Sequence, residues 1–174
     1  MTGEQVLRNL LNWQKPGLVV RNLATNLTEM KFMTGIVGHE KIFIDTNLIV
    51  YANDRRDPQK QRKAIELVKE LMDNGLGVIS SQVLQEYSSV ALNKLKQDHS
   101  IVLRQITLLE SFDVVLIKPA LIRRAIEIRS CYSISFWDSC IISAAESAGC
   151  DCIYSEDLNA GQYYSGIKMI NPLL

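Results

Sequence analysis

The chain has 174 residues, of which 47% are hydrophobic and 22% are charged. This length and composition indicate one globular domain and exclude a largely disordered chain. Lysine and arginine together number 19, as do aspartate and glutamate, so the formal net charge is zero. A neutral chain is not held on nucleic acid by bulk charge alone, although it can contact nucleic acid locally.

The sequence also indicates the cellular compartment. No apolar run approaches the ~20 residues that a membrane helix needs, and the first residues, MTGEQVLRNLLNWQKPG, lack the continuous apolar segment of a signal peptide. The four cysteines form no CxxC pair, which favours reduced core thiols over a zinc site or a disulfide framework: Cys131, Cys140, Cys150 and Cys152. We therefore expect a cytoplasmic protein without a membrane partner.

Residues 1–40 differ in texture from the rest of the chain. Helical spacing of apolar residues in the first turns ends at Pro16-Gly17, and the stretch that follows is polar and interrupted by glycines. We predict that residues 1–40 are an N-terminal extension and that residues 41–174 are the domain. The extension is either a packing appendage or lies upstream of an internal start at Met30 or Met33.

From Lys41 onward, short apolar runs alternate with segments of helical period. The predicted elements are, in chain order, strand 41–44, helix 47–52, helix 58–74, strand 77–80, helix 81–96, helix 100–111, strand 113–117, helix 119–129, helix 136–148, strand 152–155 and strand 167–170. Pro58 opens its helix, Ser81 and Ser135 are predicted N-caps, and Gly149 is a predicted C-terminal stop. This alternation predicts an α/β fold with a central, mostly parallel sheet flanked by helices.

Four acidic residues lie where a carboxylate is either costly to bury or well placed at the end of a strand or the start of a helix: Asp45, Glu86, Asp138 and Asp157. Each has an ordinary explanation when taken alone. Asp45 follows the first strand and suits a helix N-cap, Asp138 suits the first turn of a helix, and Asp157 suits a turn. Glu86 is harder to explain, because it shares a helix face with apolar residues and incurs a desolvation cost there.

Taken together, the four acids indicate a metal site. Two of them follow strands and two lie near helix N-termini, and these ends meet at one edge of a parallel sheet, where ligands bind. Four carboxylates in one pocket repel one another unless a cation is present. Oxygen ligands without histidine or cysteine at metal spacing select Mg²⁺ or Mn²⁺, which commonly serve phosphoryl chemistry.

At this point the sequence resembles a known family. The resemblance lies in IFIDTNLIVYA (42–52), SQVLQEYSSV (81–90), SFWDSCIISAAESAGCDCIYSEDLNAGQ (135–162) and IKMINPL (167–173). Four such segments in this order, each of the first three carrying its acids, are similar to the PIN-domain ribonucleases, and most similar to the VapC-like toxins of toxin–antitoxin systems. The extension, residues 1–40, has no counterpart in the compact family pattern.

The resemblance implies a specific chemistry and specific partners. Asp45, Glu86, Asp138 and Asp157 are the implied acidic quartet, with Asn47 and Ser155 as supporting polar residues. The implied activity is Mg²⁺- or Mn²⁺-dependent endonucleolytic cleavage of RNA, with Asp45 and Asp138 as direct metal ligands. The implied partners are RNA, a small antitoxin and a second copy of the chain.

Two further features have two explanations each. The cations that follow the first motif are candidates for phosphate contact or form a solvated helix face: Arg55, Arg56, Lys60, Arg62 and Lys63. Phe136 and Trp137 are able to stack on a base, but core or dimer packing is the favoured interpretation.

Two other protein classes also place acids at the ends of strands. A receiver-like module needs an acidic pair after its first strand, and a haloacid-dehalogenase-type phosphatase needs an aspartate where Asn47 stands. The remaining alternative to an enzyme is a non-catalytic domain that only binds partners, and the intact quartet argues against it.

Overall fold

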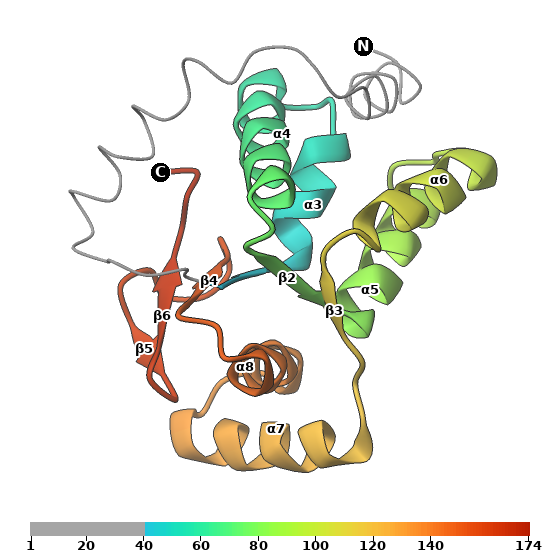
Figure 1. Ribbon diagram of the computed structural model, residues 1–174. Coiled ribbons are helices and arrows are strands. Elements are labelled where there is room, and N and C mark those ends of the chain that lie inside the picture. Colours follow the sequence, from blue (N-terminus) through green and yellow to red (C-terminus); the bar gives the residue numbers. More distant parts are fainter. Residues whose placement is uncertain (1–40) are drawn as a thin grey trace.

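The computed structural model describes residues 41–174 (Figure 1). The elements are β1 (Ile42–Ile44), α3 (Thr46–Asn53), α4 (Pro58–Asp73), β2 (Gly77–Ser80), α5 (Ser81–Asn93), α6 (His99–Leu109), β3 (Asp113–Val115), α7 (Pro119–Tyr132), α8 (Phe136–Ala148), β4 (Cys152–Tyr154), β5 (Tyr163–Tyr164) and β6 (Ile167–Ile170). The predicted α/β alternation is confirmed. The predicted extension, residues 1–40, lies outside the described residues.

One sheet forms the centre, with strands in the order β3-β2-β1-β4-β6-β5. All neighbouring strands are parallel except β5 and β6, which form an antiparallel edge. The strand order reverses direction between β1 and β4, since β2 and β3 lie on one side of β1 and the later strands lie on the other. That reversal is the place where open α/β sheets bind ligands.

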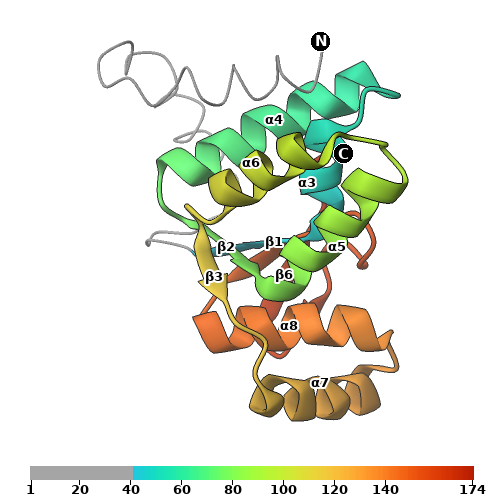
Figure 2. The same ribbon diagram turned by 90° about the vertical axis from the view of Figure 1, so that its right-hand side faces the viewer.

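Helices cover both faces of the sheet, which explains why its inner strands are apolar throughout. Figure 2 shows α3, α4 and α6 on one side and α7 and α8 on the other. Helix α8 contacts β2, β4 and β6, and α7 packs on α8. The sheet is anchored by fully buried side chains, among them Phe43, Ile44, Ile79, Ile153 and Met169.

Most helix ends are where the sequence places them. The side chain of Asp57 caps α4 ahead of Pro58, Ser135 caps α8, and Gly149 ends α8 with a φ of 68°. The prediction that Ser81 caps its helix is wrong. Ser80 is the cap, with its hydroxyl accepting from the Val83 amide, and the Ser81 hydroxyl accepts from the Ile117 amide instead.

Other differences are small and have local causes. Helix α6 begins one residue early because Asp98 caps it. Helix α5 ends at Asn93 instead of continuing to Lys96, which has a left-handed φ of 52°. The two-residue strand β5 was not predicted. Within residues 41–174, no helix is long and apolar enough to cross a membrane, and three of the four cysteines are buried free thiols.

Candidate active site

The four predicted acidic residues line one pocket of about 570 Å³ at the switch point of the sheet. Asp45 follows β1, and Asp157 lies in the loop after β4, which is the neighbour of β1. Glu86 comes from α5 and Asp138 from the first turn of α8. Asp45 is buried, Glu86 and Asp138 are half-buried, and Asp157 is exposed.

Asp45 is the most tightly held of the four carboxylates. Its Oδ1 accepts from the Thr46 amide at 2.6 Å, so it caps α3 as its ordinary explanation required. Its Oδ2 accepts from the Ser155 hydroxyl at 2.6 Å and from the side-chain amide of Asn47 at 3.0 Å. The cap and the site are therefore functions of the same side chain.

Asn47 ties the ends of β1 and β4 together. Its Nδ2 donates to Asp45, to Ser155 Oγ at 3.3 Å and to Asp157 Oδ2 at 3.1 Å. The Ser155 hydroxyl also accepts from the Asp157 amide at 3.1 Å. Both supporting residues expected from the sequence thus hold the two strand-end carboxylates in place.

The other two acids are oriented from within or beside their own helices. Glu86 accepts from the Thr46 hydroxyl at 2.7 Å and from the side-chain amide of Gln82 at 2.9 Å. Asp138 accepts from the Ser135 hydroxyl at 2.7 Å, while that hydroxyl accepts from the Asp138 amide at 3.1 Å. This reciprocal pair combines a helix cap with a carboxylate aimed at the pocket.

Burial is the main reason that the pKa of Asp45 rises from 3.8 to about 6. Hydrogen bonds from Ser155 and Thr46 oppose the rise, and the carboxylates of Asp157 and Glu86 add to it. The cause is the low polarity around the group together with like charges nearby. A cation in the pocket relieves both effects.

The donor set fits a hard divalent cation such as Mg²⁺ or Mn²⁺. Asn47, which lines the pocket, also has a buried oxygen, Oδ1, without a hydrogen-bond partner within residues 41–174. A buried carbonyl oxygen without a donor is costly, and a cation or a water is able to satisfy it. Within the same residues, however, no three Asp, Glu, His or Cys side chains stand close enough to hold an ion as placed.

The predicted cluster of cations does not act as one group. Lys60 pairs with Glu156 at 2.6 Å, Lys63 donates to the Leu173 carbonyl, and Arg56 pairs with Asp54 at 2.6 Å. Of the five cations, Arg56 alone lines the acidic pocket, and it is joined there by Lys94, which the sequence did not single out. No sequence signal links these two cations, because the fold brings them together from separate loops.

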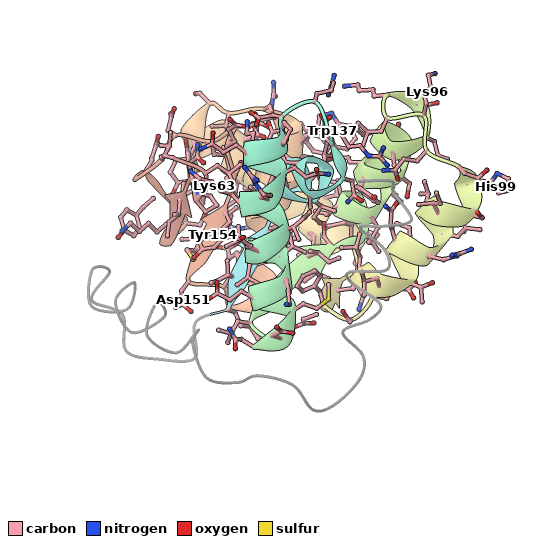
Figure 3. All side chains as sticks on the ribbon, turned by 90° about the horizontal axis from the view of Figure 1, so that it is seen from above. Lys63, Lys96, His99, Trp137, Asp151 and Tyr154 are labelled. Carbon is pink, nitrogen blue, oxygen red and sulfur yellow. The ribbon has the colours of Figure 1, made fainter. Side chains whose placement is uncertain are left out.

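Trp137 lines the acidic pocket and its side chain is 62% exposed. Core packing is therefore wrong for Trp137, although Phe136 beside it is half-buried and meets the indole edge-on at 5.6 Å. Figure 3 places Trp137 toward the same side of the molecule as Lys96 and away from Asp151. Dimer packing by Trp137 stays a prediction.

Sequence reasoning also missed Thr46 and Gln82, whose side chains orient Glu86. Both carried a weak signal. Thr46 directly follows Asp45, and Gln82 lies four residues before Glu86 on the same helix face.

The chain is similar to known proteins in sequence pattern and in fold. The PIN domain family matches residues 42–164, which span β1 to β5. No curated protein sequence matches the chain significantly.

Three solved structures share the fold. A toxin–antitoxin complex from Klebsiella pneumoniae matches with a TM-score of 0.58 and 16% identity, over 76% of this chain and 98% of that one. VapC20 from Mycobacterium tuberculosis, described as a sarcin–ricin loop cleaving toxin, matches with a TM-score of 0.53 and 21% identity, over 67% of this chain and 90% of that one. VapBC2 from Rickettsia felis, bound to a DNA fragment from its promoter, matches with a TM-score of 0.55 and 17% identity, over 74% of this chain and 96% of that one.

Proposed function

The chain belongs to the PIN domain family, and from this premise we propose that it is a divalent-metal-dependent endoribonuclease and the toxin of a toxin–antitoxin pair. The observation that carries the proposal is the meeting of Asp45, Glu86, Asp138 and Asp157 in one pocket at the switch point of the sheet. The toxins and toxin–antitoxin complexes that share the fold support the biological role.

In the proposed reaction, water attacks the phosphorus of an RNA phosphodiester in line with the leaving oxygen. When bound, Mg²⁺ or Mn²⁺ supplies the means to activate that water and to offset the charge on the leaving oxygen. Asp45 and Asp138 would be its direct ligands, and Glu86 and Asp157 would complete the set.

The chain's own residues set the positions of these ligands. The bonds from Thr46, Asn47 and Ser155 fix both oxygens of Asp45. Asn47 also donates to Asp157, so one side chain orients both strand-end carboxylates. Pre-positioning of this kind lowers the reorganisation that the reaction requires.

The test is cleavage of RNA by the full chain after metal has been removed with EDTA. Mn²⁺ or Mg²⁺ should restore cleavage, and Asp138→Asn should lower the rate by at least a hundredfold while the protein stays folded. Asp151→Asn is the matched control, because Asp151 is exposed and precedes β4 at the end opposite the pocket. If Asp138→Asn cleaves as fast as Asp151→Asn, cleavage does not depend on the acidic pocket. If the wild-type chain does not cleave RNA with either metal, the domain is a non-catalytic binding module.

The partner proposals extend the resemblance of the sequence to VapC-like toxins. A free ribonuclease harms its own cell, so we propose a cytoplasmic homodimer masked by a small antitoxin encoded nearby. An antitoxin is able to mask the acidic pocket by placing a basic side chain where the cation binds. Co-expression with the adjacent small reading frame should give a stable complex and relieve toxicity, and failure of both would refute the pairing.

A further inference from the structure

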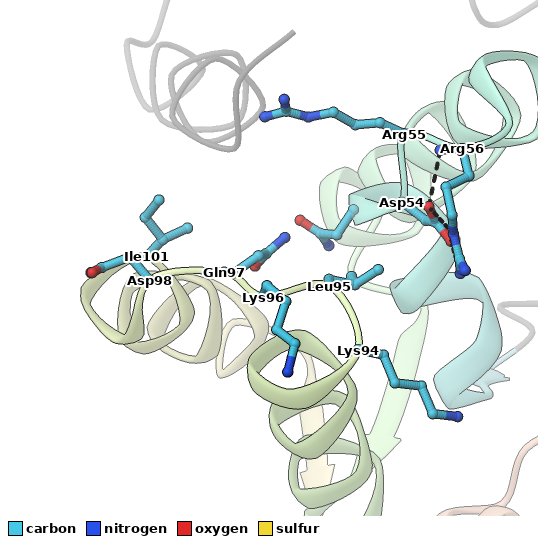
Figure 4. Close-up of a pocket in the computed structure, with 10 residues that line it drawn as sticks. Asp54, Arg55, Arg56, Lys94, Leu95, Lys96, Gln97, Asp98 and Ile101 are labelled. Atoms are coloured by element: carbon cyan, nitrogen blue, oxygen red, sulfur yellow. Dashed lines mark hydrogen bonds and ion pairs between the residues drawn. The ribbon is translucent and has the colours of Figure 1, made fainter.

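A second pocket, of about 430 Å³, lies beside the acidic one (Figure 4). Two loops form it. The loop between α3 and α4 contributes Arg55 and Arg56, and the segment between α5 and α6 contributes Lys94, Lys96 and Gln97. We call it the basic pocket.

The basic pocket carries an excess of positive charge in a chain whose net charge is zero. Four cations line it against two acids, Asp54 and Asp98, which leaves a net charge of +2. Both acids are engaged. Asp54 holds Arg56, and Asp98 caps α6 by accepting from the Ser100 amide at 2.8 Å.

Arg56 is held in a fixed position in this pocket. Its Nε and Nη2 donate to Asp54, whose side chain is only 11% exposed, whereas the Arg56 side chain is 80% exposed. Within residues 41–174, its Nη1 has no partner. A guanidinium fixed on one edge and open on the other is well suited to an anion with several oxygens.

Three other lining groups are uncommitted. Within the described part of the chain, the side chains of Arg55, Lys94 and Lys96 form no ion pair or hydrogen bond. The Gln97 side chain also has no partner there, and its Oε1 is buried. In Figure 4 the Lys94 and Arg56 side chains reach toward the same side of the pocket.

The two pockets adjoin, because Arg56 and Lys94 line both. This matters for a polyanionic substrate. The acidic pocket holds four carboxylates against those same two cations, so it repels RNA until a cation binds. Positive charge immediately beside it offsets that repulsion for the neighbouring phosphates of the strand.

We propose that the basic pocket binds a backbone phosphate of the RNA strand next to the phosphodiester that is cut. The proposal rests on the proposed function, and it adds a binding subsite made by Arg55, Arg56, Lys94 and Lys96. The subsite fixes the strand in register by charge, so it contributes affinity without reading the base sequence.

An acidic peptide is the other ligand that a positively charged pocket is able to bind. The neighbouring acidic pocket favours RNA, since an acidic peptide gains nothing from lying beside a group of four carboxylates. A peptide competitor therefore forms part of the test.

The experiment measures binding without cleavage. The full chain carries Asp138→Asn, and the probe is a fluorescein-labelled 20-nucleotide single-stranded RNA followed by fluorescence anisotropy with Mn²⁺ present. The test variant adds Arg55→Gln, Lys94→Gln and Lys96→Gln and leaves the Arg56–Asp54 pair intact. The control variant adds Lys118→Gln, Arg123→Gln and Arg129→Gln, which remove three exposed cations outside both pockets.

Each phosphate contact to a single strand contributes about 0.7 to the slope of log K against log salt, which is about fivefold in affinity at 0.1 M salt. Loss of one phosphate contact should make the test variant bind about fivefold more weakly than its parent, with a salt slope smaller by about 0.7. The control variant should lose less than threefold. Circular dichroism should show that both variants remain folded.

Two results would overturn the proposal. The first is equal affinity and equal salt slope for the test and control variants. The second is loss of poly-glutamate binding in the test variant with RNA binding unchanged, which would assign the pocket to an acidic protein. Because the parent does not cleave, this outcome is independent of whether the wild-type chain is a ribonuclease.

Discussion

Replacement of Asp45 by Asn should make the protein more stable at neutral pH and less stable in acid, when no metal is present. Burial holds the pKa of Asp45 at about 6, against an ordinary value of 3.8. The folded chain therefore binds a proton on Asp45 between these two pH values, whereas the unfolded chain releases it. Stability consequently falls as pH rises through this window and stays reduced above it.

The size of the effect follows from the two pKa values. At about 1.36 kcal/mol per pH unit, the ionised carboxylate lowers the free energy of unfolding at pH 7.5 by about 3 kcal/mol relative to a pH below both values. Asparagine avoids this penalty. It also replaces Oδ2, which accepts from Ser155 and from Asn47, by a donor group that faces the Asn47 amide, at a cost of about 1–2 kcal/mol.

The two effects have different pH dependences, so the stability curves of the two proteins should cross. At pH 4 the variant should be about 1 kcal/mol less stable than wild type, because the hydrogen-bond loss outweighs the small part of the ionisation penalty that is already present there. At pH 7.5 it should be about 1–2 kcal/mol more stable, or about 2–8 °C higher in melting temperature at ~2–4 °C per kcal/mol. Other groups with shifted pKa values, such as Asp54 and Glu156, are common to both proteins and cancel in the difference.

Divalent metal should reverse the order at neutral pH. A cation that binds the folded pocket stabilises wild type by about 2.7 kcal/mol at a hundredfold excess over Kd, or roughly 5–10 °C. Asp45→Asn should lose most of this increase, and Asp151→Asn should keep it. The measurements are paired thermal melts in EDTA and in Mn²⁺ at pH 7.5, and in EDTA at pH 4.

One result would refute this reasoning. If Asp45→Asn melts below wild type by the same margin at pH 4 and at pH 7.5, then Asp45 carries no ionisation penalty and acts chiefly as the cap of α3. Its place among the metal ligands would then have to be abandoned.

Three further predictions follow from the structure. Gly77→Ala should lower the free energy of unfolding by about 1–3 kcal/mol in urea denaturation, because the added Cβ would overlap the buried ring of Phe112. Trp137→Ala should change stability by less than about 0.5 kcal/mol, since the indole is 62% exposed, yet should weaken RNA binding in anisotropy assays by about 1–3 kcal/mol if a base stacks on it. A chain that begins at Met33 should melt and cleave like the full chain, and loss of either property would place residues 1–32 in the core or at an interface.

Local rules accounted for most element boundaries, because the signals that end helices are themselves local. Pro58 and Gly149 stand where the sequence predicted a helix start and stop. The error at the start of α5 came from adjacent serines, Ser80 and Ser81, which are equivalent as caps in a sequence. The tertiary contact of Ser81 with the Ile117 amide distinguishes them, and no local pattern contains it.

Strand β5 shows a different limit. Two residues, Tyr163 and Tyr164, give too short a run for an alternating pattern, and they pair antiparallel with β6 across a turn that contains Gly166, whose φ is 83°. Their strand conformation depends on that pairing. The parallel core strands, in contrast, were predictable because burial on both faces leaves continuous apolar runs.

The acidic residues were predictable as a group for a topological reason: parallel strands and their crossover helices bring strand ends and helix starts to the same edge. That rule says nothing of Asn47, whose amide joins Asp45 to Asp157 only because β1 and β4 are neighbours. It is also silent on Lys94, which reaches both pockets from the end of α5 because α3 packs against α5. Sequence therefore located the acids that would hold a cation and two of the cations that would hold the strand, Arg55 and Arg56. Lys94 and Lys96 joined them only because helix packing brings together two loops that are far apart in the chain.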